Sequence, residues 1–362
     1  QPRANFRFAQ PNLGTLKDFK SIAKLQGPID LEKVIVCTGF AEVGPWGSAR
    51  TRWEQEARGE FTIEGVIEMA WIMGFIQHHS GPLKNGGKQY VGWVDVKSGE
   101  PVEDKDMKAR YEKEILEHAG VRLIEPELFG GYDPKKKGFM QEIEINHDLE
   151  PIEVSAEEAS KFKREHGDKC DAWEDKAAGS WFIMLKKGAR VMVPKAVAFS
   201  RLVAGQIPTG WSGKRYGIPD DIVANVDRTT LWALVCTAEA LVMSGLGGSA
   251  YELYKYVHPS HVGTSLGSGM GGQSSMHKMF VDRVKELEVN QDVLQETFIN
   301  TVAGLCNLLL MSSSGPVKIP VGACATGLQS IEIASETILS GKAKVMIAGG
   351  FDDLSEEGSY EL

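Results

Sequence analysis

The sequence contains no long hydrophobic run and no excess of basic residues, and each absence excludes a class of function. Its longest apolar stretches, such as residues 306–311, fall far short of the roughly 20 residues that cross a bilayer, so we expect no membrane partner. Lysine and arginine number 40 against 49 aspartates and glutamates, which gives a formal charge of −9. Since no basic tract alternates with aromatic residues either, we expect no nucleic-acid partner.

Cysteine is scarce, and the pattern of the five cysteines excludes a disulfide framework. Cys37, Cys170, Cys236, Cys306 and Cys324 are odd in number, far apart and without a C-x-x-C pair. Such spacing is typical of a reduced protein without a zinc knuckle, and it predicts a cytoplasmic location.

Metal and nucleotide motifs are also weak or missing. His258 and His261 are separated by a proline and have no third ligand nearby. The glycines of GSGMGG at residues 267–272 match the G-x-G-x-x-G spacing of dinucleotide sites, but no acidic residue about 20 positions later ends a second strand. We therefore expect neither a metal nor a bound cofactor in this region.

What the sequence does contain is the residue mixture of a globular protein. It has 362 residues, of which 42% are hydrophobic and 25% charged, enough for one large domain or two ordinary ones. Residues 1–31, with scattered proline and glycine, are predicted to be a linker or lead-in. Residues 32–60 and 189–362 are predicted to form one α/β domain. Between them, residues 61–188 are dense in lysine and glutamate and are predicted to be an α+β insertion.

Hydrophobic periodicity predicts the elements of both parts. A short apolar run predicts a strand buried on both faces at residues 34–38. In the insertion we expect a helix at 61–77, a strand at 142–146, and a hairpin of strands 181–185 and 190–193. In the C-terminal part we expect helices at 227–243, 291–311 and 326–339, and strands at 261–266, 317–321 and 344–348. Strand–helix–strand spacing of this length indicates a right-handed parallel crossover.

One segment has the pattern of a nucleophile turn. Cys324 follows a predicted buried strand, precedes a predicted helix, and is framed by small residues, among them Gly322 and Gly327. Small neighbours allow a tight turn and the approach of a substrate carbonyl to the sulfur. The amides at the N-terminus of the helix favour a thiolate and can donate to an oxyanion. This pattern favours an acyl-cysteine nucleophile over one more buried thiol.

Several motifs together resemble the β-ketoacyl synthases. ACATG at 323–327, followed by a helix and AGG at 348–350, is similar to the active-site half of that family. GFAEVGPWG at 39–47 and GSGMGG at 267–272 are similar to its first glycine loop and its pocket loop. A narrower resemblance, to the ketosynthase region of fungal type I fatty acid synthase α subunits, rests on WGSARTRW (46–53), QDVLQETFIN (291–300) and DDLSEEG (352–358).

This resemblance implies an α/β, thiolase-like fold of two similar halves, of which this chain holds the half with the nucleophile. Cys324 would accept an acyl chain from acyl carrier protein, and the acyl-enzyme would condense with decarboxylated malonyl-carrier protein. Substrates would arrive on the carrier's phosphopantetheine, so the region itself would need no cofactor. The substrate-binding residues would be Met270, Gly269, Ala323, Ala325 and Thr326. An alternative for Met270 is a gap-filling core residue.

The resemblance also implies partners and a missing part. The family needs two histidines and a lysine from its second half, and none of the eight histidines here falls in such a motif. We therefore expect the chain to be a portion of a longer subunit that does not condense substrates by itself. The implied partners are acyl carrier protein, a second copy in a ketosynthase homodimer, and the fatty acid synthase β subunit.

Three alternatives remain open from the sequence. A related α subunit could make short acyl starters for a secondary metabolite, and only the volume of the acyl pocket would distinguish it. The chain could instead be a non-catalytic assembly module with an unreactive Cys324. Acetyl transfer of the thiolase type is disfavoured, because the motifs match the decarboxylating branch.

Overall fold

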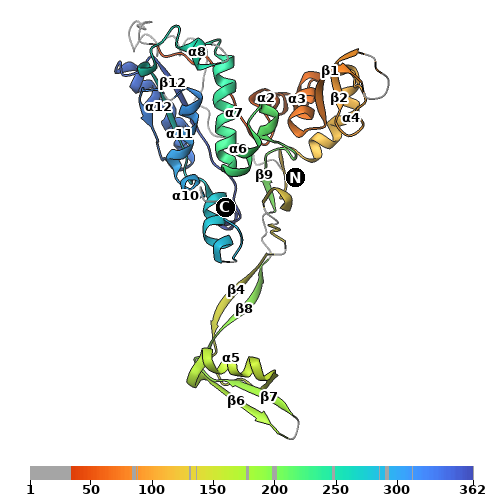
Figure 1. Cartoon of the computed structure of the whole chain (residues 1–362), viewed down its shortest axis with the longest axis vertical. Helices are drawn as coiled ribbons and strands as arrows, with labels where there is room; N and C mark the ends of the chain where they lie inside the picture. The colour runs from red at the N-terminus through yellow and green to blue at the C-terminus, as the bar shows by residue number, and fades with distance from the viewer. Residues whose placement is uncertain are drawn as a thin grey trace, which may run out of the picture. The chain divides into compact units, whose positions relative to one another are not determined.

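The computed structural model describes residues 34–83, 87, 89–129, 132–135, 137–176, 179–197, 202–246, 249–284, 286–289, 293–311 and 313–361 (Figure 1). The predicted lead-in at 1–31 lies outside these residues. The chain divides into two compact units: unit 1 comprises Gln1–Leu116 and Gly210–Leu354, and unit 2 comprises Glu117–Thr209 and Ser355–Leu362.

Unit 1 contains a parallel sheet in which β10 lies between two neighbours. The strands are β11 (Val317–Lys318), β10 (Val262–Gly267) and β12 (Val345–Gly350), in that order. Every residue of β10 is buried, as a central strand covered on both faces requires. The strands predicted at 261–266 and 344–348 are thereby confirmed. The one predicted at 317–321 shortens to two residues, and Pro320, which has no N–H to donate to a sheet, follows it.

Helices pack on this sheet, and two of them lie where the hydrophobic pattern predicts them. α7 (Arg228–Met243) and α12 (Thr326–Leu339) match the predicted helices closely. The helix predicted at 291–311 is broken instead into α10 (Val293–Glu296) and α11 (Ile299–Leu309), because Phe298 is extended and the Thr297 hydroxyl donates to the Leu294 carbonyl. α11 packs on α7 and β10 around a core of Ala233, Leu266, Val302, Ala303 and Cys306.

The predicted strand at 34–38 is wrong. These residues form no strand, and the side chains of Val34 and Val36 are 46% and 68% exposed. Directly after the segment the backbone lies against α7: a Cβ on Gly39 would lie 2.2 Å from the Ala240 carbonyl oxygen. An apolar run predicts burial in a sheet only where neighbouring strands are present to pair with it, and none in the described part of the chain does so here.

The N-terminal part of unit 1 is a helical pair followed by a hairpin. It contains α2 (Ala49–Arg58), α3 (Ile63–Met73), the antiparallel strands β1 (Ile76–Pro82) and β2 (Gln89–Asp95), and α4 (Asp104–Glu117). Thr62 caps α3, and the buried Glu54 accepts hydrogen bonds from the Thr62 amide (2.9 Å) and hydroxyl (2.8 Å). The helix predicted at 61–77 is thus confirmed but shorter, because Gly74 ends it in the left-handed conformation.

Unit 1 is completed by short elements between these parts. They are η4 (Gly213–Tyr216), α6 (Asp220–Asn225), α8 (Ala250–Leu253), η5 (Pro259–His261), α9 (Gln273–His277) and η6 (Lys278–Asp282). From η4, the Arg215 guanidinium donates to the Ile72 carbonyl of α3 (3.0 Å). This contact helps to explain why residues 61–116 belong to unit 1, whereas the sequence places them in an insertion that begins at 61.

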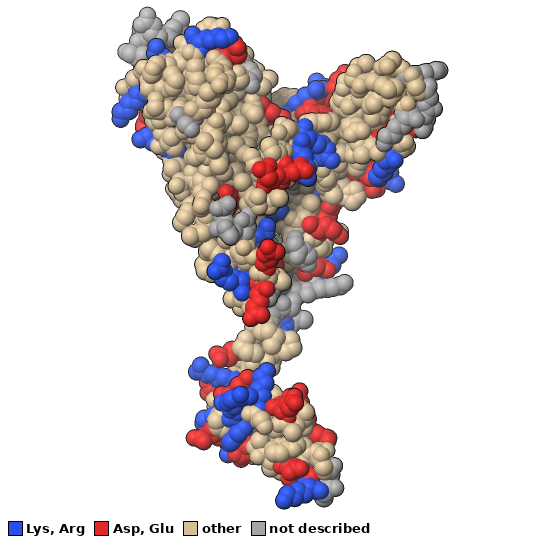
Figure 2. All heavy atoms as spheres, viewed as in Figure 1, with Lys and Arg blue, Asp and Glu red and all other residues tan. Residues whose placement is uncertain are grey.

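Unit 2 is built from antiparallel strands. β4 (Lys137–Glu144) pairs with β8 (Arg190–Val197), and β3 (Val121–Leu123) pairs with β9 (Val203–Gly205). A second sheet has the order β5 (Ile152–Val154), β7 (Ser180–Leu185), β6 (Cys170–Asp175), and α5 (Ala156–His166) packs on it. The remaining elements are η2 (Pro126–Phe129), η3 (Gly167–Lys169) and α13 (Glu356–Glu361). Around α5, Figure 2 shows charges of both signs close together.

The strands predicted at 181–185 and 190–193 exist, but they do not form a hairpin with each other. β7 pairs with β5 and β6, whereas β8 pairs with β4. Gly188 (φ +83°) does lie in a turn after β7, but the Gly188 amide donates to the carbonyl of Ile145 (2.7 Å), which directly follows β4. The chain therefore enters β8 beside β4 and not beside β7. The hairpin that forms instead is β6–β7, and Gly179 lies in its turn.

A polar network joins the two ends of Glu117–Thr209, the segment of unit 2 that we call the unit 2 excursion. Arg122 donates to the Glu125 carboxylate (2.7 Å) and to the Gln206 carbonyl (2.8 Å), and the Thr209 hydroxyl also donates to Glu125. Burial alone would raise the pKa of Glu125, but these donors and the His118 ring hold it at about 2. Residues more than 80 positions apart are therefore joined by one carboxylate.

Candidate nucleophile site

Three segments leave the carboxyl ends of the parallel strands and meet at the same edge of the sheet. Residues 268–272 follow β10, residues 319–325 follow β11, and Asp352 and Asp353 follow β12. Because the strands are parallel, their carboxyl ends share one edge, where open α/β sheets commonly bind ligands. The predicted nucleophile and the predicted pocket loop therefore lie on adjacent strand ends.

Cys324 lies on a sharp turn immediately before α12. It is the middle residue of η7 (Ala323–Ala325), and its side chain is exposed. Ala323 has φ +49°, a left-handed conformation that costs a non-glycine residue about 1 kcal/mol. The Thr326 hydroxyl offsets this cost: it accepts from the Gly322 amide (2.9 Å) and donates to the Ala323 carbonyl (2.7 Å). The turn thus presents the sulfur outward at the N-terminus of a helix.

Glycines let the backbones around this turn approach each other closely. A Cβ on Gly267 would lie 2.0 Å from the Pro320 carbonyl oxygen, and a Cβ on Gly350 would lie 2.9 Å from the Gly327 Cα. On the pocket loop, a Cβ on Gly269 would lie 3.2 Å from the Ala323 Cα. Small residues are therefore required on both sides of the nucleophile turn, as the sequence predicts.

The pocket loop is ordered by a buried serine. Ser268 is 0% exposed, and its hydroxyl accepts from the amides of Met270 (3.1 Å) and Gly271 (2.7 Å). Met270 itself is 45% exposed. In the described part of the chain Met270 therefore does not fill a gap in the core, and it lies on the loop that leaves the same edge of the sheet as the Cys324 turn.

A partly buried ion pair forms at Asp353, shortly after the end of β12. Arg228, at the start of α7, donates to the Asp353 carboxylate and to the Leu354 carbonyl (3.0 Å). Burial raises the pKa of Asp353 to about 6, even though the Arg228 guanidinium opposes that rise. Asp227 caps the same helix and also accepts from the Ser275 amide and hydroxyl (3.2 and 2.9 Å). These contacts fix the N-terminus of α7 beside the sheet edge.

The structure brings most of the predicted site residues together but gives them different roles. Cys324, Ala323 and Ala325 are exposed on the turn, and Gly269 contacts that turn. Thr326, in contrast, is 2% exposed and acts on the site through the turn that it stabilises. Sequence reasoning missed Ser268 and Asp352. The available signal for Asp352 was the pair of carboxylates that follows the predicted strand 344–348 within a few residues.

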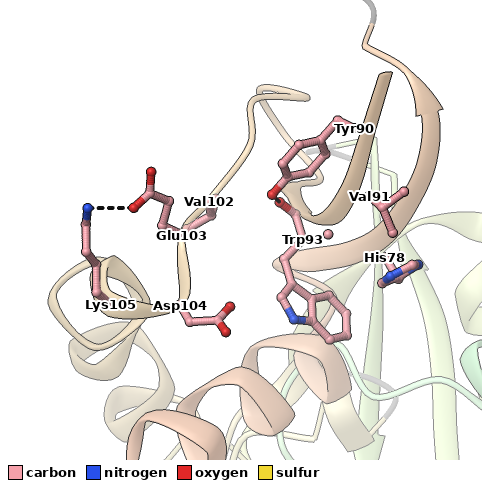
Figure 3. Close-up of a pocket in the computed structure, with 9 residues that line it drawn as sticks. His78, Tyr90, Val91, Trp93, Val102, Glu103, Asp104 and Lys105 are labelled. Carbon is pink, nitrogen blue, oxygen red and sulfur yellow. Dashed lines mark hydrogen bonds and ion pairs between the residues drawn. The ribbon is translucent and has the colours of Figure 1, made fainter. Parts of the chain in front are cut away.

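Other features of the described residues do not belong to this site. A surface hollow of about 520 Å³ lies between β1, β2 and the start of α4 (Figure 3). Trp93, Tyr90 and His78 line it. Glu103 lines it as well and forms an ion pair with Lys105 at 2.5 Å. None of its lining residues is a predicted site residue. Among the described side chains no group of three His, Cys, Asp or Glu could hold a metal ion. No described helix has both the length and the apolarity to cross a membrane.

Comparison with known proteins finds one family domain and close relatives that the chain resembles. Residues 195–362 match the model of the β-ketoacyl synthase N-terminal domain. All of the chain aligns with fatty acid synthase subunit alpha of Saccharomyces cerevisiae (59% identity over 364 residues) and of Candida albicans (58% over 363). In each case it covers 19% of the relative, so the chain spans about a fifth of the length of these curated relatives.

The fold is shared with a more distant enzyme of known structure. The noncanonical ketosynthase FabY from P. aeruginosa matches with a TM-score of 0.62 and 19% identity. The match covers 87% of this chain and 47% of that one. At this identity the likeness shows the fold alone, and it confirms the predicted α/β, thiolase-like class.

Proposed function

We propose, from the match of residues 195–362 to the β-ketoacyl synthase N-terminal domain and from the 58–59% identity to fungal fatty acid synthase α subunits, that the chain carries the acyl-accepting cysteine of a 3-oxoacyl-[acyl-carrier-protein] synthase. The observation that carries the proposal is the exposed Cys324 on a strained turn at the N-terminus of α12. A buried structural thiol would need neither exposure nor a left-handed residue before it.

The proposed step is a transfer of an acyl group between two sulfur atoms. The Cys324 thiolate attacks the carbonyl carbon of an acyl thioester on acyl carrier protein, and a new C–S bond forms while the bond to the carrier's phosphopantetheine sulfur breaks. The released thiolate takes up the proton that Cys324 gave up. We propose that the amide of Cys324, which precedes the first turn of α12, donates to the oxyanion. Condensation with malonyl-carrier protein would then extend the acyl chain by two carbons.

The pocket loop is proposed to receive the acyl chain. Gly269 lies against Ala323 of the nucleophile turn, and the next residue in the chain is the exposed, apolar Met270. Acyl chains are apolar, and a polarizable, unbranched methionine adapts well to them. The acyl carrier protein delivers the substrates, so we propose no cofactor of the region's own.

An exposed apolar face supports the proposed assembly partners. Leu328, Ile331 and Leu339 of α12 are 72%, 55% and 58% exposed, and the surface over α11 and α12 in Figure 2 is largely uncharged. A face of this kind favours contact with further protein, which we propose to be a second copy in a ketosynthase homodimer. The fatty acid synthase β subunit is proposed as the other component of the assembly, and the cytoplasm as its location.

The test is covalent loading of Cys324 in the full-length subunit. Wild-type protein incubated with carrier protein that bears an acyl thioester should gain the mass of one acyl group on the peptide that contains Cys324. Cys324→Ala should abolish this gain, whereas Cys306→Ala, which removes a buried core thiol, should retain it. Loading of the Cys324→Ala protein at the wild-type level would contradict the proposal. An unreactive Cys324 in correctly assembled wild-type protein would favour the assembly-module alternative.

A further inference from the structure

One carboxylate oxygen holds the pocket loop from the end of the neighbouring strand. Asp352 Oδ1 accepts hydrogen bonds from the Ser268 hydroxyl (2.8 Å), the Gly269 amide (3.0 Å) and the Met270 amide (3.2 Å). The Ser268 hydroxyl accepts in turn from Met270 and Gly271. Every amide from 269 to 271 is therefore directed at Asp352 or at the serine that donates to it.

These bonds determine where the Gly269–Met270 peptide lies. Hydrogen bonds to a charged acceptor are stronger than bonds between neutral groups. Glycines at 269, 271 and 272 leave the loop little rigidity of its own. Its position comes from these contacts, from the packing of Gly269 on Ala323, and from the close approach of Gly272 to the Glu296 carbonyl.

We propose that Asp352 is a positioning residue that sets the acyl chain-length preference by fixing Met270 relative to the Cys324 turn. The inference rests on the proposed function, in which Met270 flanks the acyl chain. It goes further in assigning the selectivity to a carboxylate that need not touch the substrate. A shift of Met270 changes the apolar space that the acyl chain occupies, so long and short chains are affected unequally.

The neighbouring carboxylate provides a matched control. Asp353 is one residue away, but its described hydrogen bond is with Arg228 at the start of α7. Asp353→Asn therefore changes a carboxylate at the same strand end and spares the three bonds to the loop. Asp352→Asn keeps a carbonyl oxygen as an acceptor and removes the charge, whereas Asp352→Ala removes the acceptor as well.

The experiment compares hexanoyl and palmitoyl loading of Cys324 from carrier protein, in the full-length subunit assembled with its partners. Asp352→Ala should change the ratio of the two loading rates about fivefold or more, the scale on which apolar pockets discriminate chain length. Asp352→Asn should give a smaller change, and Asp353→Asn should leave the ratio as in wild type. Equal loss with both donors, or an unchanged ratio in Asp352→Ala, would overturn the inference.

Hydrogen exchange of the peptide that covers residues 267–272 gives a readout that does not depend on loading. Exchange should be faster in Asp352→Ala and in Ser268→Ala, and unchanged in Asp353→Asn. If wild-type Cys324 fails to load while the exchange pattern appears, the proposed function fails and loop positioning stands. If wild type loads and the exchange of residues 267–272 is unaffected by Asp352→Ala, positioning fails while the proposed function stands. Should Asp352→Ala not assemble, the Asn variant decides by the same two readouts.

Discussion

The nucleophile turn and the unit 2 excursion use glycine and charge in different ways. Around Cys324, glycines allow backbone segments distant in sequence to touch, and the charged groups lie at the surrounding strand ends. In Glu117–Thr209, by contrast, glycines such as Gly167, Gly179 and Gly188 end a helix or form turns with positive φ, and a charged network around Glu125 joins the two ends. The first region depends on close packing across the sheet edge. The excursion depends on the pairing of antiparallel strands and on the hydrogen bonds of Glu125 that join its two ends.

This difference predicts where a single methyl group is tolerated. A Cβ at Gly267 would lie 2.0 Å from the Pro320 oxygen and 2.7 Å from the Thr326 Cγ2, whereas at Gly188 its nearest neighbour is the mobile Lys169 Nζ at 3.3 Å. Gly267→Ala should cost about 3 kcal/mol or more by overpacking, and it should abolish Cys324 loading. Gly188→Ala should cost only about 1 kcal/mol for its left-handed φ.

Both glycine variants can be measured in the full-length subunit. Hydrogen exchange of residues 262–272 and 181–193 reports local stability, and acyl loading reports the site. Equal tolerance of the two substitutions would remove the contrast between the regions.

The second expected effect concerns acid stability of the excursion. The folded pKa of Glu125, about 2, lies below the ordinary value of 4.5, so the stability that this carboxylate adds to the fold is fully present above pH 4.5 and is lost as pH falls toward 2. We expect about 2 kcal/mol, after allowance for its partial exposure. Glu125→Gln should lose that stability at neutral pH and show a flatter pH dependence in the exchange of residues 118–125. Glu153→Gln, at an exposed position, is the control and should behave as wild type. If the exchange in Glu125→Gln depended on pH as steeply as in wild type, Glu125 would not be the group that joins the two ends of the excursion.

The smallest effect concerns the hydroxyl under the nucleophile. Thr326→Val keeps the shape of a 2% exposed side chain but leaves the Gly322 amide without its acceptor, at a cost of about 1.5 kcal/mol. Loading of Cys324 should slow, because the turn that presents the sulfur is loosened. Thr326→Ser keeps the hydroxyl and should restore the wild-type rate. If the valine variant loaded as fast as wild type, the turn would owe its geometry to packing alone.

Local patterns predicted much of the nucleophile region. Helix 326–339, strand 344–348 and the Cys324 turn follow from short-range periodicity and small residues, and α12 and β12 confirm the two elements. Local patterns predicted less well where a strand must pair with another strand from elsewhere in the chain. The run at 34–38 is apolar, yet Val36 is 68% exposed. The strands at 181–185 and 190–193 were found, but their pairing was wrong, because a turn at Gly188 does not specify which strand the chain meets next.

The sequence alone determined the chemistry that this chain offers: a lone cysteine between small residues at the start of a helix, with a glycine loop elsewhere in the chain. The tertiary structure decided which groups serve that cysteine. It placed the ends of β10, β11 and β12 together, aimed three donors at Asp352, and turned Thr326 inward to support Ala323. The physical reason is range: capping and periodicity act over a few residues, whereas the bond between Ser268 and Asp352 spans 84 positions and exists only once the parallel sheet has formed.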